Sequence, residues 1–410
     1  MSYNNILIKL FSICMLDMLS YAMFSPIMVF SFLKGSLSLT QGITDSHHLL
    51  LGIFLSSYSI TQFISSPFWS KIAIERGKKT VLLCSMTGGF VGYICCFLGI
   101  KYRFIWALFI GSSIAGLTGS NTIMIHSYIC QLTPKPLWSR YYSFLGVITG
   151  VAFIAGPLIS SKVLGDNPSH INSLSILKLC LLFSATNLSI VFWGIKNSIG
   201  AQQPPEAKSY KILPSLKSYN LSTEIKFIFA FLFFLNISWY SFIKFFQAHL
   251  YEYYSFSESL CCKATSILGA SCAIWQILRT ITSTIFFDKK IWLSYGSYIM
   301  LIASIIHLFS INKWSTLISI ILFSFAYSTL IPSILARIFK IEDNSPKEFR
   351  ASIYQCTQAA SKILAPLLTG ALASFCSISP ALMCTYSLIL CATLPTAEAL
   401  YFKKYKQIRT

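Results

Sequence analysis

Residues 140–163 read RYYSFLGVITGVAFIAGPLISSKV, an apolar run with a basic residue near each end. About 20 such residues can cross the hydrocarbon core of a bilayer as a helix, so the stretch predicts a membrane span. Gly146 and Gly150 lie one helical turn apart, which would let a neighbouring helix approach closely. Gly156 and Pro157 follow, and proline removes a backbone donor and permits a bend.

The whole chain has the composition of a membrane protein. Of its 410 residues, 55% are hydrophobic and only 11% are charged, whereas a soluble domain carries about 25% charged residues. This excludes a cytosolic enzyme, a disordered chain and a disulfide-stapled secreted domain. Because we find no Walker loop, no hydrolase motif and no metal-ligand cluster in the sequence, we expect no enzyme activity, no cofactor and no metal site.

Twelve apolar stretches of this kind follow one another along the chain. They lie near residues 6–32, 48–73, 80–100, 103–130, 140–163, 173–195, 224–250, 262–286, 291–311, 314–339, 349–374 and 380–402. The sequence therefore predicts an all-α membrane protein of twelve transmembrane helices in two pseudo-symmetric six-helix bundles. The bundles would be residues 1–195 and 224–410, joined by a more polar cytoplasmic linker at residues 196–223.

The basic residues predict how the chain is oriented. With both termini in the cytoplasm, 23 of the 32 Lys and Arg residues lie on the cytoplasmic side and 7 on the outer side, while Lys244 and Lys362 lie inside spans. Cytoplasmic loops are enriched in Lys and Arg, so we expect both termini in the cytoplasm. The net charge of +19 then reflects this asymmetry and not a nucleic-acid-binding surface. The lack of a long soluble domain favours a bacterial inner membrane.

The two predicted bundles contain a repeated pattern. Arg140 is followed about 16 residues later by Gly156-Pro157, and Arg350 is followed at similar spacing by Ala365-Pro366. One interpretation is chance similarity between two proline-containing helices. The other is a duplicated six-helix unit, the architecture of large secondary transporters, whose substrate site lies near the bilayer midplane between the halves.

Several of these stretches resemble the major facilitator superfamily, and in particular its drug–proton antiporters and tetracycline exporters. The residues from Gly146 to Pro157 resemble the antiporter signature G-x-x-x-G-x-x-x-x-x-G-P. Leu16-Asp17, followed by Pro26, resembles the first span of the tetracycline exporters. The resemblance implies a transporter that moves a small organic solute by alternating access.

Two further stretches match the family only in part. Gly77, Lys78 and Lys79 match the end of the signature loop, which in the family forms a charge latch on the cytoplasmic face. Ser70 replaces the first glycine of that loop, and Ile74-Glu75 replace its Asp-Arg pair. Ala115-Gly116 and Gly119 match span four, where Ser112 stands in place of the arginine that the family associates with proton transfer.

Asp17 is the candidate for proton coupling or for sensing the substrate. It lies near the middle of the first span, and a charged side chain at that depth costs about 2.5–3.5 kcal/mol on insertion scales. A carboxyl in this position can accept and release a proton during a transport cycle. The alternative is a structural role, in which Asp17 ties the first span to a neighbour.

Other polar residues in the spans are candidates for the substrate site. Lys362 lies at similar depth in the eleventh span and would pair with Asp17 or bind an anionic substrate. His126 could titrate, or be a hydrogen-bonded structural residue. The remaining cavity-lining candidates are Gln62, Asn121, Asn236, Trp239, Lys244, Gln276, Gln355 and Gln358. The conformational candidates are Gly77, Lys78, Lys79, Arg140, Gly146, Gly150, Gly156, Pro157, Arg350 and Pro366.

The sequence thus predicts a monomeric secondary transporter whose partners are a small-molecule substrate, protons and the lipid bilayer. Proton-coupled efflux of a drug or metabolite is the leading hypothesis. Import of an anionic nutrient on the same fold is an alternative, motivated by Lys362 and Lys244. A membrane sensor or scaffold that transports nothing is a second alternative, motivated by the altered signature loop and by Ser112.

Overall fold

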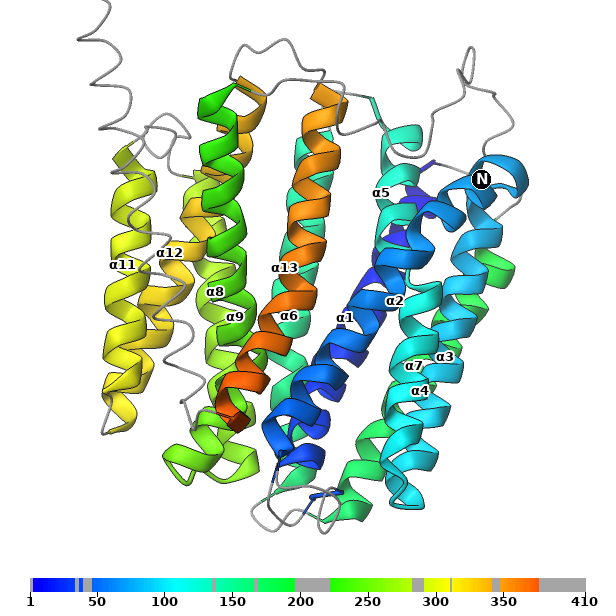
Figure 1. The fold of residues 1–410 in the computed structure, drawn as a ribbon. Helices are drawn as coiled ribbons and strands as arrows, with labels where there is room; N and C mark the ends of the chain where they lie inside the picture. Colours follow the sequence, from blue (N-terminus) through cyan, green and yellow to red (C-terminus); the bar gives the residue numbers. More distant parts are fainter. Residues whose placement is uncertain are drawn as a thin grey trace, which may run out of the picture. The chain divides into compact units, whose positions relative to one another are not determined.

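The computed structural model describes residues 3–33, 37–39, 46–134, 138–165, 169–195, 222–281, 291–309, 312–340 and 347–375. All regular secondary structure in these ranges is helical (Figure 1). The first helices are α1 (Tyr3–Phe32), α2 (His47–Arg76), α3 (Lys78–Lys101), α4 (Ile105–Thr118), α5 (Asn121–Leu132), α6 (Trp138–Leu164) and α7 (His170–Gly194). The others are α8 (Thr223–Tyr253), α9 (Glu258–Ile281), α11 (Ile291–Leu308), α12 (Lys313–Lys340) and α13 (Lys347–Phe375).

The described helices confirm an all-α, multi-pass membrane architecture. Eight of them, α1, α2, α3, α6, α7, α8, α9 and α12, are long and apolar enough to cross a membrane. The helix α4 and residues Tyr295–Leu308 of α11 are shorter apolar helices, whereas α5 and α13 belong to neither group. The predicted span at 380–402 and the linker up to residue 221 lie outside the described residues.

The predicted fourth span is not one continuous helix. The structure breaks it at Gly119 and Ser120, which separate α4 from α5. Neighbouring helices bind the backbone groups exposed there, since Gln62 Nε2 donates to the Gly119 carbonyl at 2.5 Å and Ser85 Oγ accepts from the Ser120 N–H at 3.2 Å. Because these partners replace hydrogen bonds within the helix, a break is tolerated inside the membrane.

The chain divides into two compact units. Unit 1 comprises Met1–Ser209 and Leu250–Ala270, and unit 2 comprises Tyr210–His249 and Ser271–Thr410. The boundaries fall inside α8 and α9, so the first turns of α9 belong with the N-terminal helices. The division at the linker, residues 196–223, remains a prediction.

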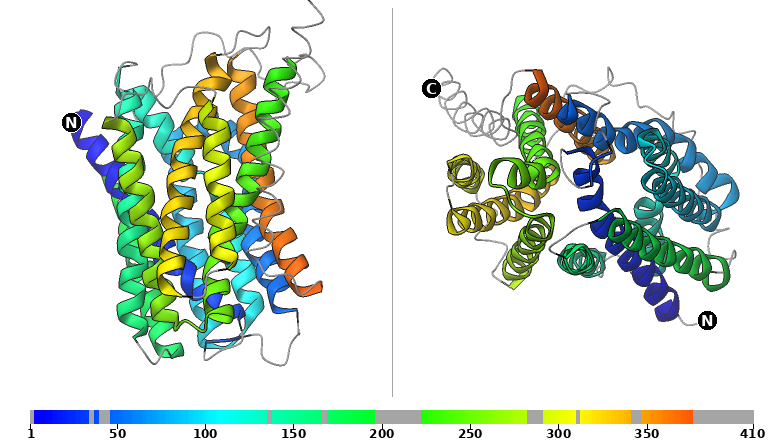
Figure 2. Two further views of the ribbon diagram at one scale, coloured as in Figure 1. Left: turned by 90° about the vertical axis from the view of Figure 1, so that its left-hand side faces the viewer. Right: turned by 90° about the horizontal axis from the view of Figure 1, so that it is seen from below.

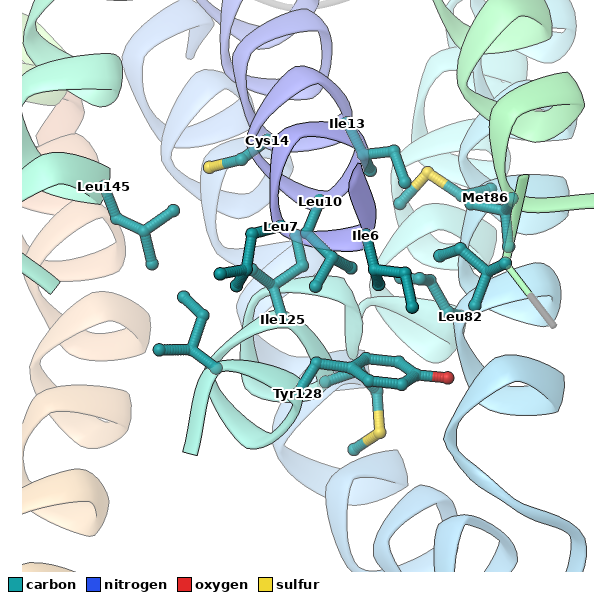
Figure 3. Close-up of a cluster of buried hydrophobic side chains, with 14 of the residues drawn as sticks. Ile6, Leu7, Leu10, Ile13, Cys14, Leu82, Met86, Ile125, Tyr128 and Leu145 are labelled. Atoms are coloured by element: carbon teal, nitrogen blue, oxygen red, sulfur yellow. The ribbon is translucent and has the colours of Figure 1, made fainter. Parts of the chain in front are cut away.

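In unit 1, α1 packs against α6 and α7, while α3 packs against α4 and α7. Figure 3 shows part of the hydrophobic core near the start of α1, where Ile6, Leu7 and Leu10 face Ile125 and the ring of Tyr128 on α5. Side chains from α3 and α6 complete the cluster, among them Leu82, Met86 and Leu145. This packing fixes α5 beside the first turns of α1.

Gly156 marks a close approach of α6 to α1. A Cβ atom added there would lie 2.6 Å from Ala22 Cβ and 3.0 Å from the Met23 backbone nitrogen. Ser160, one turn later, donates to the Met23 carbonyl at 3.0 Å. The Gly-Pro end of the signature therefore serves close packing within unit 1. Figure 2 shows α11 and α12 side by side in unit 2, where they are packed along their lengths.

Candidate functional site

A carboxyl group of α1 meets the first residue of α5 in unit 1. Asn121 Nδ2 donates to Asp17 Oδ2 at 2.5 Å, and Asp17 is half-buried. The contact depends on the break in the fourth span, because the break makes Asn121 the first residue of a separate helix. The structure thus brings together two residues that the sequence predicted independently.

Two tyrosines from two other helices lie near this pair. Tyr58 on α2 and Tyr93 on α3 lie within electrostatic range of the Asp17 carboxyl. Gln62 Nε2 lies 3.5 Å from the Tyr58 hydroxyl while it donates to the Gly119 carbonyl at the helix break. Four helices therefore contribute to one polar group, which we call the Asp17 cluster: Asp17, Tyr58, Gln62, Tyr93 and Asn121. No sequence pattern identified the two tyrosines, although both lie within predicted apolar spans.

Ser112, which stands where the family resemblance implies an arginine, makes an uncharged contact. Ser57 Oγ on α2 and Ser112 Oγ on α4 share a hydrogen bond at 2.9 Å. This hydroxyl pair joins α2 to α4 and contributes no positive charge next to the Asp17 cluster.

His126 lies on the exposed face of α5, five residues after Asn121. Its role as a titrating group remains a prediction.

The matching residues of the signature loop bind helix ends inside unit 1. Gly77 joins α2 to α3 with a φ of +87°, a conformation that glycine adopts without strain. Lys78 Nζ donates to the Ser127 carbonyl at 3.1 Å and to Gln131 Oε1 at 3.0 Å, near the end of α5. Lys79 Nζ donates to the Phe192 carbonyl at 3.0 Å, near the end of α7. Cations stabilise helix C-termini, so both lysines have a structural role besides the predicted latch.

The other conformational candidates are only partly described. Gly146 and Gly150 lie on α6 and are partly exposed, while Pro157 and Pro366 are buried in α6 and α13. Arg350 Nη1 donates to the Ile338 carbonyl at 2.7 Å near the end of α12, and Arg350 is 3% exposed. The side chains of Arg140, Ser70 and Ile74 lie outside the described residues.

A second polar and aromatic group lies in unit 2. Lys362 Nζ on α13 lies 5.8 Å from the centre of the Tyr240 ring on α8, a cation–π arrangement. Tyr327 on α12 lies within electrostatic range of Tyr240 and Tyr354. Gln358 Nε2 donates to the Tyr354 hydroxyl at 2.7 Å. We call this group, Tyr240, Tyr327, Tyr354, Gln358 and Lys362, the Lys362 cluster.

Trp239 packs against the Lys362 cluster. Its ring stacks on Tyr327 with the centroids 3.7 Å apart and an interplanar angle of 5°. Phe323 lies on the same stack and packs against Phe242 at 4.0 Å. The stack therefore joins α8 to α12 through buried rings, and Tyr327 links it to the Lys362 cluster.

Two buried histidines were not among the predicted site residues, and one of them, His307, packs against Phe242 of this stack. His249 and His307 are 3% and 2% exposed, and their ring centroids lie 4.9 Å apart. Ser319 donates to the Thr316 carbonyl at 2.7 Å, so its oxygen accepts from His307 Nδ1 at 3.2 Å. The position of two histidines inside predicted apolar spans was a signal that could have identified them.

The remaining cavity candidates lie at several depths. Asn236 is fully buried in α8, Lys244 is half-buried in the same helix, and Gln276 is exposed on α9. Gln355 lies in α13, but its side chain is outside the described residues. Asp17 belongs to unit 1 and Lys362 to unit 2, so their pairing remains a prediction.

The sequence is similar to a known protein family and to several of its members. Residues 10–366 match the family model of the Major Facilitator Superfamily. The class H tetracycline resistance protein of Pasteurella multocida is 33% identical over 119 residues, 29% of each chain. The class C protein of Escherichia coli is 25% identical over 197 residues, which are 46% of this chain and 47% of that protein. The multidrug resistance protein MdtG of Proteus mirabilis is 26% identical over 171 residues, 40% and 41% of the two chains.

The aligned regions cover less than half the length of these curated relatives. Solved structures match over nearly the whole chain at low identity. The human organic anion transporter MFSD10 has a TM-score of 0.66 and 14% identity, covering 96% of this chain and all of that one. A D-xylose–proton symporter has a TM-score of 0.71 and 13% identity, covering 96% and 97%. At such identities these structures support the fold alone.

Proposed function

The chain belongs to the Major Facilitator Superfamily, and we propose that it is a secondary transporter that exports a small organic solute in exchange for protons. Relatives named as tetracycline and multidrug resistance proteins support the direction and the class of solute. We propose that the protein lies in a bacterial inner membrane. Both termini would lie in the cytoplasm, as the distribution of Lys and Arg predicts.

The hydrogen bond between Asn121 and Asp17 is the observation that best supports proton coupling. A bond to an ionised carboxylate is roughly twice as strong as one between neutral groups. Protonation of Asp17 therefore weakens the link between α1 and α5, and deprotonation restores it. Because α5 is a separate half-helix, proton uptake would be linked to a movement of this helix relative to α1.

The test is transport by purified protein in liposomes, driven by an imposed proton gradient. Tetracycline is the first solute to measure, followed by hits from a thermal-shift panel of drug-like compounds. We expect the D17N variant to abolish gradient-driven flux while its elution profile and helicity remain those of the wild type. The matched control is Glu252→Gln, which removes an exposed carboxylate outside the Asp17 cluster and should preserve flux. Unchanged gradient-driven flux in D17N would refute the coupling role.

A second candidate function is import of an anionic solute through the Lys362 cluster. The supporting observation is Lys362 above the Tyr240 ring, because the ammonium and the nearby phenol hydroxyl groups would bind a carboxylate or a phosphate ester. We expect Lys362→Ala to abolish uptake of such anions, whereas Lys263→Ala, an exposed lysine of α9, should not. Anion uptake that survives Lys362→Ala excludes this candidate, and flux of any solute by purified protein excludes a scaffold that transports nothing.

A further inference from the structure

A groove of about 420 Å³ lies between the beginning of α1 and the end of α7 in unit 1. Its lining residues are Lys9, Ser12, Ser189, Ile190, Trp193 and Gly194. None of these residues belongs to the Asp17 cluster or was a candidate in the sequence analysis. The groove combines one positive charge, two hydroxyl groups and an indole N–H with an apolar wall.

Lys9 crosses the end of α7 and carries the charge of the groove. Its Nζ donates to the Gly194 carbonyl at 3.1 Å. A Cβ atom added at Gly194 would lie 3.1 Å from Lys9 Cδ, so the missing side chain lets the lysine lie flat against the helix. An ammonium group has three N–H donors, and the Gly194 carbonyl occupies one of them.

The surroundings of the groove fit the boundary between acyl chains and lipid headgroups. Ile8, Phe192 and Trp193 are 62%, 60% and 77% exposed on the surface of unit 1. Exposed apolar side chains of a membrane protein face lipid, and tryptophan is enriched at the membrane–water interface. Lys79 adds a second positive charge at this helix end, where it donates to the Phe192 carbonyl at 3.0 Å.

We propose that this groove binds the headgroup of an anionic phospholipid that also carries hydroxyl groups, such as phosphatidylglycerol. Lys9 and the Trp193 indole N–H would donate to the phosphate, since ammonium–phosphate contacts are strong hydrogen bonds. The hydroxyls of Ser12 and Ser189 donate to the carbonyls of Ile8 and Ala185, each at 3.0 Å. Their oxygens therefore act as acceptors toward the hydroxyls of a glycerol headgroup.

Native mass spectrometry of the full-length protein in detergent tests this site with equal amounts of phosphatidylglycerol and phosphatidylcholine. We expect the wild type to retain phosphatidylglycerol over phosphatidylcholine. Lys9→Gln should weaken phosphatidylglycerol retention about five-fold, the contribution of one basic residue near an anionic lipid surface. The matched control is Lys226→Gln, an exposed lysine of α8 on the same predicted side of the membrane, which should leave retention unchanged. Equal retention by Lys9→Gln and wild type would overturn the proposal.

Two further measurements distinguish binding of the lipid from binding of a free phosphate ester, and from a loss of retention caused by misfolding. We expect sn-glycerol 3-phosphate to leave the bound lipid in place, because it has no acyl chains to lie against Ile190 and Trp193. Displacement of the lipid by this compound would mean that the groove binds soluble phosphate esters instead. We expect the wild type to prefer phosphatidylglycerol over phosphatidic acid, whose headgroup has no glycerol hydroxyls. The Ser12→Ala/Ser189→Ala variant keeps the Lys9 charge and should lose this preference. A preference that persists would contradict the assigned hydroxyl contacts.

Discussion

Asn121 reaches the carboxyl group of Asp17 because the fourth span is interrupted immediately before it. The 2.5 Å bond joins the first residue of α5 to the middle of α1. At the break, Gln62 and Ser85 bind the Gly119 carbonyl and the Ser120 N–H, which a continuous helix would pair internally. The contact between Asp17 and α5 thus depends on the helix break, which residues of α2 and α3 stabilise.

Removal of this donor should weaken both stability and coupling. We expect Asn121→Ala to lower the free energy of unfolding by about 1.5–3 kcal/mol, the net value of a hydrogen bond to a charged group. Thermal unfolding in detergent measures the first effect, and gradient-driven flux in liposomes measures the second. Thr122→Ala alters the next, exposed position of α5 and should leave both unchanged. An Asn121→Ala protein with wild-type stability and flux would show that the bond is incidental.

Gly156 should be intolerant of even one added carbon atom. Gly→Ala in a helix gains about 0.8–1 kcal/mol of helix propensity, but the new Cβ would lie 2.6 Å from Ala22 Cβ. Overpacking costs about 1–3 kcal/mol, so we expect a net loss of stability in Gly156→Ala. Gly89→Ala in α3 is the control, because a Cβ there meets no atom within 4 Å. That variant should be neutral or more stable, so its melting temperature should not fall below that of the wild type, whereas the melting temperature of Gly156→Ala should.

The contact between His48 and Glu252 should contribute little to stability. His48 Nε2 lies 2.6 Å from Glu252 Oε2, with side-chain exposures of 23% and 34%. Exposed pairs of this kind are worth about 0.2–1 kcal/mol. A double-mutant cycle with His48→Gln and Glu252→Gln, followed by thermal unfolding, should give a coupling energy in that range. A coupling energy well above that range would indicate a structurally essential pair.

Composition and the spacing of apolar residues were sufficient to predict the helical membrane fold. They could not predict the break at Gly119 and Ser120, because the polar partners there come from α2 and α3 and lie 57 and 35 residues away in sequence. Asp17 was identified from the cost of a charge in a membrane, whereas its contact with Asn121 depends on that break. His249 and His307 were overlooked because each lies singly in its own apolar stretch and only the packing of α8 against α11 brings them together.

Asn236 offers a test of whether buried polarity is retained for transport at the expense of stability. Within the described residues, its side chain is 0% exposed, and neither its Oδ1 nor its Nδ2 has a hydrogen-bond partner. A buried polar group left without a partner costs about 1–3 kcal/mol. Leucine has a similar size and no polar atoms, so Asn236→Leu should raise the melting temperature in detergent.

Asn236 lies one helical turn before Tyr240 of the Lys362 cluster, so we expect the same variant to transport more slowly if the amide contacts solute during the cycle. Ser238→Ala is the comparison, because the Ser238 hydroxyl is equally buried but donates to the Phe234 carbonyl at 2.9 Å. A stabilised Asn236→Leu protein with full transport would assign the amide no part in transport, and a destabilised one would show that it has a polar partner in the folded protein.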